Sequence, residues 1–274
     1  MQLAASSVSK TFGRSRGGHA GARKAVDGVS LSVGPGDFTA VVGESGSGKS
    51  TLARMLLGLI APDEGEVTFD GVSLSAMSRA QLLRFRRSVQ CVLQDPSAAL
   101  NPRKPVFEVL AEVIRLHGIA RGRGVREKVF EALELVDLLP AEQFADRYPH
   151  QLSGGQRQRV LIARAVILNP RIIIADEAVS ALDVSVKAGI LKLLSRLQDE
   201  MGLGYLFITH DLPVVRKVTK DVFVMRAGRV VEHASKDELF AGPSTEYARE
   251  LLAAAPVPDP LLARAWIRGA RAVR

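Results

Sequence analysis

A glycine-rich segment offers the clearest chemistry in this sequence. Residues 43–50 read G-E-S-G-S-G-K-S and fill every required position of the pattern G-x-x-x-x-G-K-[ST]. Glycines lack a Cβ, so the backbone can wrap closely around a polyphosphate and point its N–H groups inward. The pattern predicts a phosphate-binding loop in which Lys49 reaches the β- and γ-phosphates and the Ser50 hydroxyl takes a Mg²⁺ position. The predicted nucleotide-binding residues of this segment are Gly43, Glu44, Ser45, Gly46, Ser47, Gly48, Lys49, Ser50 and Thr51.

A pair of acidic residues could complete this chemistry. Asp176 ends the apolar run at residues 172–175, and Glu177 follows it directly. At a strand end the chain turns, so both carboxylates can face one nucleotide. One would hold the metal through water while the other polarises the attacking water. The alternative, two acidic residues at a surface turn, is disfavoured by the phosphate loop. Phe12 is a further candidate, because an aromatic ring there could stack on adenine or belong to the core.

The elements around these residues predict an α/β core with a helical insertion. The apolar run at residues 38–42 reads as a buried strand and residues 50–60 as a helix, which is the order a phosphate loop requires. From residue 95 to 168 the pattern is mostly helical, and strands then resume. Other predicted strands are 2–12, 24–33, 66–70, 88–93, 171–176, 203–209, 221–225 and 229–231. Other predicted helices are 78–85 with a Ser cap, 106–117, 125–138 and 184–201. The predicted units are 1–93 with 166–242 (core), 94–165 (helical) and 243–274 (C-terminal extension and basic tail).

A second motif resembles a known family. Residues 152–156 read L-S-G-G-Q, followed by R-Q-R, and resemble the signature of ABC-type ATPases. Gln94 resembles the Q-loop glutamine, residues 180–183 the D-loop and His210 the switch histidine, and the resemblance covers residues 2–255. It implies a P-loop NTPase core with a mixed β-sheet, N-terminal antiparallel strands and an inserted α-helical subdomain. Phe12 falls where the family's adenine-stacking aromatic usually lies.

The resemblance also implies how the site works. Ser153, Gly154, Gly155 and Gln156 would form an anion site at a helix N-terminus, which caps the γ-phosphate bound by a second subunit. The implied cofactors are ATP and Mg²⁺, with two ATP molecules buried in a head-to-tail dimer. The implied catalytic residues are Glu177, His210 and Gln94; Asp183 would contact nucleotide; and the implied metal ligands are Ser50, Gln94 and Asp176.

Three further segments resemble the oligopeptide/dipeptide/nickel branch of ABC importers. They are residues 95–103, which contain L-N-P-R, residues 148–159 and residues 247–256. Ala178 departs from the more usual D-E-P, and is similar to nickel-type subunits, as are residues 101–104 and 187–190. The resemblance therefore favours nickel or a metal chelate without excluding peptides. The C-terminal extension has no cysteine, so no iron–sulfur cluster is expected there.

Composition limits the alternatives. The chain has 274 residues, 47% of them hydrophobic, and its apolar runs are too short for a membrane span of about 20 residues. The N-terminus shows no signal pattern, and the single Cys91 excludes an intramolecular disulfide. Much of the net charge of +8 lies in residues 14–24 and in the last fourteen residues, 261–274, where Trp266 is the one aromatic residue, so no nucleic acid is expected. A solvated loop and tail, or contact with anionic lipid, remain open.

These observations predict the ATP-hydrolysing, energy-coupling subunit of an ABC importer. The expected partners are a second ATPase subunit, identical or homologous, a transmembrane permease pair and an extracytoplasmic solute-binding protein. The expected location is peripheral, on the cytoplasmic face of the cell membrane. One alternative is a soluble ABC ATPase that assists a phosphonate-processing or nucleic-acid-acting complex. Another is an interaction module without turnover, disfavoured by the presence of Lys49, Asp176, Glu177 and His210.

Overall fold

Two sheets and eleven α-helices make up the part of the chain that the computed structural model describes, residues 1–13, 23–93, 96–180 and 182–254. The strands are β1 Leu3–Phe12, β2 Arg23–Val33, β3 Phe38–Val42, β4 Glu64–Phe69, β5 Val72–Ser73, β6 Val89–Val92, β7 Ile172–Asp176, β8 Gly204–Thr209, β9 Asp221–Arg226 and β10 Arg229–Ser235. The α-helices are α1 Lys49–Leu56, α2 Arg79–Ser88, α3 Pro96–Ala99, α4 Val106–Leu116, α5 Arg123–Leu135, α6 Ala141–Ala145, α7 Gly154–Val166, α8 Val184–Met201, α9 Leu212–Val218, α10 Lys236–Ala241 and α11 Glu246–Ala253. Short 3₁₀ helices cover Leu74–Ala76 and Pro149–Gln151.

The larger sheet has six strands in the order β10-β9-β3-β8-β7-β6. β3 runs parallel to both β8 and β9, and β6, β7 and β8 are parallel neighbours, whereas β10 is antiparallel to β9. Every residue of β3 and β8 is buried. Both strands therefore read as continuous apolar runs, as expected for a sheet covered on both faces.

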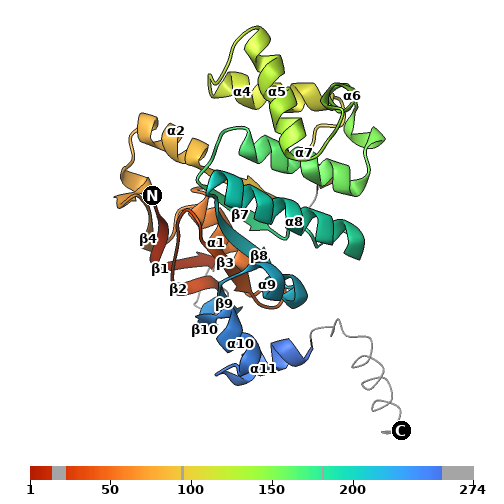
Figure 1. Cartoon of the computed structure of the whole chain (residues 1–274). Coiled ribbons are helices and arrows are strands. Elements are labelled where there is room, and N and C mark those ends of the chain that lie inside the picture. Colours follow the sequence, from red (N-terminus) through yellow and green to blue (C-terminus); the bar gives the residue numbers. More distant parts are fainter. Residues whose placement is uncertain (14–22, 94–95, 181, 255–274) are drawn as a thin grey trace, which may run out of the picture.

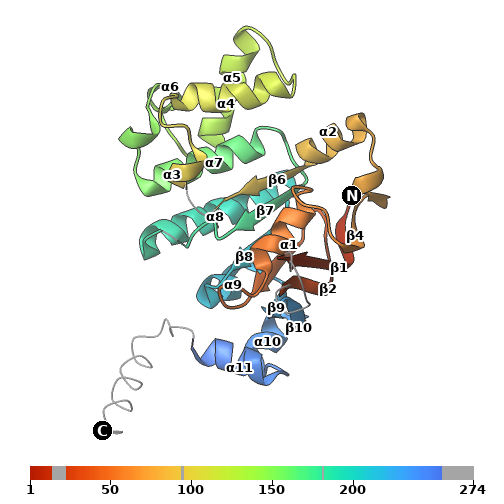
Figure 2. The ribbon, with the colours of Figure 1, turned by 180° about the vertical axis from the view of Figure 1, so that it is seen from behind.

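Successive side chains of the strand β8 point to opposite faces of the large sheet and pack in two different hydrophobic clusters. Tyr205 and Phe207 of β8 pack with α7 and α8, while Leu206 and Ile208 pack with α1 and the antiparallel strands. Figure 1 shows α8 in front of the sheet, and Figure 2, seen from behind, shows α1 on the other side. The carboxyl ends of the parallel strands thus lie at one edge, between two covering layers.

The smaller sheet is antiparallel, in the order β2-β1-β4-β5. In β2, Val29, Leu31 and Val33 are buried while Ser30 and Ser32 are exposed, as their alternation predicts. Phe12 at the end of β1 pairs with Arg23 at the start of β2. This pairing brings an aromatic ring and a guanidinium to the same end of the sheet.

Helices α3 to α7 gather at one end of the molecule, remote from α10 and α11 (Figure 1). Asp137, just after α5, accepts from Arg159 of α7 (2.7 Å) and from Arg196 of α8 (2.8 Å). Arg196 also donates to the Leu135 carbonyl (2.9 Å). One aspartate therefore joins the helical region to the helix that packs on the large sheet.

The predicted α/β class, with N-terminal antiparallel strands and inserted helices, is confirmed, but several element ends are wrong. The helix predicted at 50–60 ends at Leu56, because Gly58 adopts a left-handed φ of 65°. The helix predicted at 125–138 is α5, which ends before Asp137 at φ 57°. Helices α3, α6, α9, α10 and α11 were not predicted individually. The Ser78 cap of α2 is confirmed, whereas the division into units stays a prediction.

Candidate nucleotide site

A cavity of about 270 Å³ lies between the segment joining β3 to α1 and the end of the antiparallel sheet. Both the glycine-rich segment and β1–β2 supply its walls. Its lining residues are Phe12, Arg23, Ala25, Ser45, Gly46, Gly48, Lys49, Ser50, Thr51 and Glu177. The half-exposed Phe12 ring is therefore part of the cavity wall and not of the core, which supports the stacking interpretation.

The glycines of the loop allow its close passage between two strands. Gly48 has φ 106°, and a Cβ there would lie 2.2 Å from the Ala25 carbonyl oxygen of β2. A Cβ on Gly43, at φ 153°, would lie 2.1 Å from the Met225 carbonyl oxygen of β9. Only glycine fits these two positions. Gly43, Glu44 and Ser47 do not line the cavity. The Ser47 carbonyl accepts from the Gly228 N–H at 2.9 Å and so anchors the loop.

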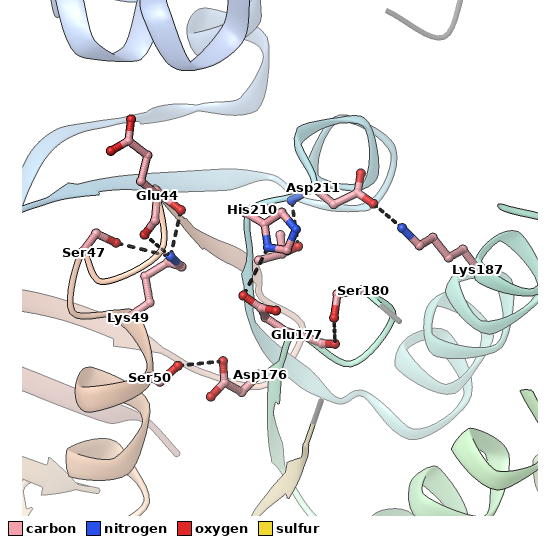
Figure 3. Close-up of polar contacts among 12 residues, drawn as sticks. Glu44, Ser47, Lys49, Ser50, Asp176, Glu177, Ser180, Lys187, His210 and Asp211 are labelled. Atoms are coloured by element: carbon pink, nitrogen blue, oxygen red, sulfur yellow. Dashed lines mark hydrogen bonds and ion pairs between the residues drawn. The ribbon is translucent and has the colours of Figure 1, made fainter. Parts of the chain in front are cut away.

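Lys49 is buried and held by the loop itself. Its Nζ donates to the carbonyl oxygens of Gly43 and Glu44, both at 2.8 Å, and to Ser47 Oγ at 3.3 Å (Figure 3). Burial lowers the pKa of Lys49, and the nearby carboxylates of Glu177, Asp176 and Glu44 oppose that change. Binding of phosphate by Lys49 requires exchange of these internal acceptors for phosphate oxygens.

Ser50 and Asp176 offer two oxygen donors beside the loop. Ser50 Oγ donates to Asp176 Oδ1 at 3.4 Å (Figure 3). Burial raises the pKa of Asp176; the Ser50 bond lowers it and the charge of Glu177 raises it. A hard cation would relieve this desolvated charge, so the donors fit Mg²⁺ held partly by nucleotide oxygens. Among the described residues no group of three or more His, Cys, Asp and Glu side chains could hold a metal by itself.

Glu177 turns sharply out of β7. Its φ is 49°, an uncommon value for a residue with a side chain, and its N–H donates to the Ile208 carbonyl at 2.8 Å. Ser180 Oγ donates to the Glu177 carbonyl at 2.9 Å. His210 Nδ1 lies 3.1 Å from Glu177 Oε1 (Figure 3). The turn brings Glu177 to the cavity wall, whereas Asp176 does not line the cavity and reaches it only through its bond to Ser50. It also places an imidazole against the Glu177 carboxylate.

An ion pair stabilises the chain beside His210. Lys187 of α8 donates to Asp211 Oδ2 at 2.8 Å, and Asp211 Oδ1 caps α9 at the Val214 N–H. Both side chains of the pair are mostly buried. The backbone next to His210 is therefore held between a strand end and a capped helix, by contacts that the sequence did not reveal.

The signature segment lies apart from the cavity, at the N-terminus of α7, a position whose N–H groups suit an anion. Ser153 caps α7: its Oγ accepts from the Gln156 N–H (3.2 Å), and Gln156 Oε1 accepts from the Ser153 N–H (3.0 Å). Gly154 and Gly155 carry the first N–H groups of the helix, for which an α-helix has no acceptor. None of these residues lines the cavity at the phosphate loop. Asp183 begins α8 and is exposed. Gln94 lies outside the described residues, as do residues 14–22 and 264–274 of the basic segments.

Three contributors to the site were missed from the sequence. Arg23 lines the cavity, although it belongs to a segment interpreted as a solvated basic loop. It pairs with Phe12 across the β1–β2 hairpin, and that pairing could have indicated its position. Tyr247 of α11 contacts the phosphate loop through the Glu44 N–H. The Lys187–Asp211 pair is the third, and its partners are far apart in sequence.

Solved structures share this fold. The ATP-binding cassette MJ0796, described as a dimeric post-hydrolysis state bound to ADP and Pi, has a TM-score of 0.73 and 31% identity, over 85% of this chain and 98% of that chain. CbiO1 from Clostridium perfringens, described as part of the ABC transporter complex cbiONQ, has a TM-score of 0.74 and 28% identity, over 96% and 98%. The fold and the site thus define a P-loop ATPase of the ATP-binding cassette type.

Residues 26–180 match the ABC transporter family, and the chain belongs to this family. The chain is 48% identical over 236 residues to the Glutathione import ATP-binding protein GsiA of Salmonella paratyphi A, and 47% identical to that of Escherichia coli strain K12. These matches cover 86% of the chain but 38% of each relative, so the chain spans well under half of their length. The predicted family and ATPase class are confirmed. None of the helices in the described ranges is long and apolar enough to span a membrane.

Proposed function

We propose that this chain is the ATP-hydrolysing subunit of an ABC importer and that it works as an ATP-sandwiched dimer. One observation carries this proposal: the phosphate-loop cavity and the anion site at the start of α7 are separate within the chain. A γ-phosphate bound at Lys49 would thus be capped by Ser153, Gly154 and Gly155 of another subunit, identical or homologous. The dimeric structures of the similar cassette MJ0796 support the same assembly.

In the proposed reaction, each candidate residue has a separate task. Phe12 stacks on adenine, and Lys49 exchanges its loop acceptors for phosphate oxygens. Glu177 polarises the attacking water, and His210, 3.1 Å from Glu177, orients that carboxylate and contacts the γ-phosphate. Mg²⁺, held by Ser50, Asp176 and Gln94, would neutralise charge on the β- and γ-phosphates. Asp183, at the start of α8, would contact nucleotide from the D-loop.

The solute is proposed to be a small peptide or a nickel or metal chelate. The 48% identity to a protein named for glutathione import supports a peptide, since glutathione is a tripeptide. Ala178 and residues 101–104 and 187–190 are the sequence argument for nickel, and that preference stays a prediction. A transmembrane permease pair and an extracytoplasmic solute-binding protein would complete the importer. The chain would then lie on the cytoplasmic face of the membrane.

The dimer can be trapped and then broken. Glu177→Gln is expected to lower kcat by about 10²–10⁴-fold while ATP binding is retained, and to yield an ATP-dependent dimer in size-exclusion chromatography. Ser153→Glu in this background places a negative charge at the γ-phosphate and is expected to abolish the dimer. Ser235→Glu is the matched control, because Ser235 caps α10 with the same type of capping box.

Two outcomes would contradict the proposal. Unchanged turnover in Glu177→Gln would remove Glu177 as the general base. A trapped dimer that survives Ser153→Glu as well as it survives Ser235→Glu would remove α7 from the composite site. Co-purification with a permease pair tests the importer function. Recovery only with soluble enzymes or nucleic acid would favour the alternative, a soluble ABC ATPase of a phosphonate-processing or nucleic-acid-acting complex.

A further inference from the structure

The phosphate loop is tied to a helix near the end of the described chain. The Glu44 N–H donates to the Tyr247 hydroxyl at 3.2 Å, across 203 residues of sequence. Tyr247 belongs to α11 and is only 4% exposed. None of the tasks proposed above uses this contact, and no motif of the phosphate loop requires it.

The contact fixes one particular peptide group. The Glu44 N–H and the Gly43 carbonyl belong to the same planar trans peptide and point in opposite directions. Lys49 Nζ binds the carbonyl end at 2.8 Å, and Tyr247 binds the N–H end. The peptide is therefore held from both sides: from the cavity by a lysine that must move to bind phosphate, and from behind by a tyrosine.

Tyr247 is itself held firmly in place. Its ring packs in a core cluster with Val42 of β3 and Leu212 of α9, and the Arg226 guanidinium lies 4.5 Å from the ring centroid. The start of α11 is anchored by the buried Glu232 of β10. Its carboxylate accepts from the N–H groups of Ser244 and Thr245, both at 2.8 Å, and from the Thr245 hydroxyl at 2.6 Å. The anchor on β10 thus fixes the position of the Tyr247 hydroxyl relative to the phosphate loop.

We propose that Tyr247 is a positioning residue for nucleotide binding. When Lys49 leaves the Gly43 and Glu44 carbonyls for phosphate, the Lys49 restraint on the Gly43–Glu44 peptide is lost. The Tyr247 hydroxyl then keeps that peptide in its orientation and preserves the loop that the phosphates enter. Tyr247 of α11 is accordingly a supporting part of the nucleotide site. The inference rests on the proposed function, because it requires that Lys49 bind ATP.

Tyr247→Phe removes the hydroxyl and keeps the ring in the core cluster. The loss of one neutral hydrogen bond is expected to raise the Kd and KM for ATP about three- to tenfold, with kcat unchanged, because ground state and transition state use the loop equally. The Glu44 amide is expected to exchange with solvent faster. Tyr205→Phe is the matched control: the Tyr205 hydroxyl is fully buried and has no partner among the described residues, so its removal is expected to leave Kd and KM unchanged.

The experiment separates the possible failures. Unchanged Kd, KM and Glu44 exchange in Tyr247→Phe overturn the inference and leave the proposed function intact. A lower melting temperature with unchanged Kd shows a structural role only and also overturns it. A tenfold loss in kcat at constant KM places Tyr247 in the chemical step and contradicts a positioning role. A wild-type chain that neither binds nor hydrolyses ATP removes the proposed function, and the inference with it.

Discussion

Two glycines of the same loop are expected to respond very differently to alanine. Gly46 has φ 79°, and a Cβ at this position would have no neighbouring atom within 4 Å. Gly48 has φ 106°, and a Cβ there would lie 2.2 Å from the Ala25 carbonyl oxygen. Gly46→Ala therefore adds only backbone strain, about 1 kcal/mol of unfolding free energy. Gly48→Ala adds the same strain and a collision with backbone, which side-chain rotation cannot relieve.

The size of that second effect follows from the overlap. Relief requires the start of α1 to move from β2 by roughly 1 Å, and such overpacking costs about 1–3 kcal/mol. Gly48→Ala is therefore expected to lose about 2–4 kcal/mol in total, and ATP binding with it, since Gly48 also begins α1.

Urea unfolding of both variants measures this difference, provided that the slope m stays at its wild-type value. Equilibrium ATP binding is measured in parallel. If Gly48→Ala is no less stable than Gly46→Ala, the close approach of the loop to β2 does not govern these positions, and the steric explanation of the glycine pattern is refuted.

Three further perturbations act on charged groups of the site. ATP affinity is expected to fall as the pH rises through the pKa of Lys49, which burial lowers below the ordinary 10.5, because phosphate binds the protonated ammonium. A Kd for ATP that stays constant up to pH 10.5 would contradict this. On acidification, Mg²⁺ affinity is expected to fall at a pH above 3.8, the ordinary pKa of aspartate, because burial raises the pKa of Asp176. Mg²⁺ titration of the ATP complex at several pH values measures this affinity. Loss of Mg²⁺ affinity only near pH 3.8 would count against the prediction. Lys187→Met is expected to lower the free energy of unfolding by about 1–2 kcal/mol and to lower kcat, because the 2.8 Å pair with Asp211 holds the backbone next to His210. A double-mutant cycle with Asp211→Asn that gives no coupling energy would exclude this role of the pair.

Local patterns predicted the local structure around the candidate site, while the roles of its residues stay predictions. The glycine spacing, the acids at the end of β7 and the Ser153 cap depend on short segments, in which residue type fixes backbone geometry directly. The missed helices also carry local signals. Ser235 and Glu238 form a capping box before α10, and Asp211 caps α9, whose first turn contains a proline. These short helices have too few apolar positions for a clear periodicity.

The long-range contacts around the site could not be predicted from the sequence. The Tyr247–Glu44 bond spans 203 residues, and the Lys187–Asp211 pair joins a helix to a strand end 24 residues away. Neither contact leaves a periodic trace, because each depends on how whole elements pack. The left-handed φ of Glu177 occurs where its N–H bonds to Ile208 of the neighbouring strand, and no residue spacing encodes that contact.

The shared aspartate between α7 and α8 has a mechanical consequence. Asp137 binds Arg159 and Arg196 with separate carboxylate oxygens. Gly155 of α7 also packs closely against α8, because a Cβ there would lie 2.6 Å from Val186 Cγ1. The start of α7 is thus held to α8 at two places four residues apart, about 6 Å at 1.5 Å per residue. A movement of α8 would therefore carry the first N–H groups of α7 with it.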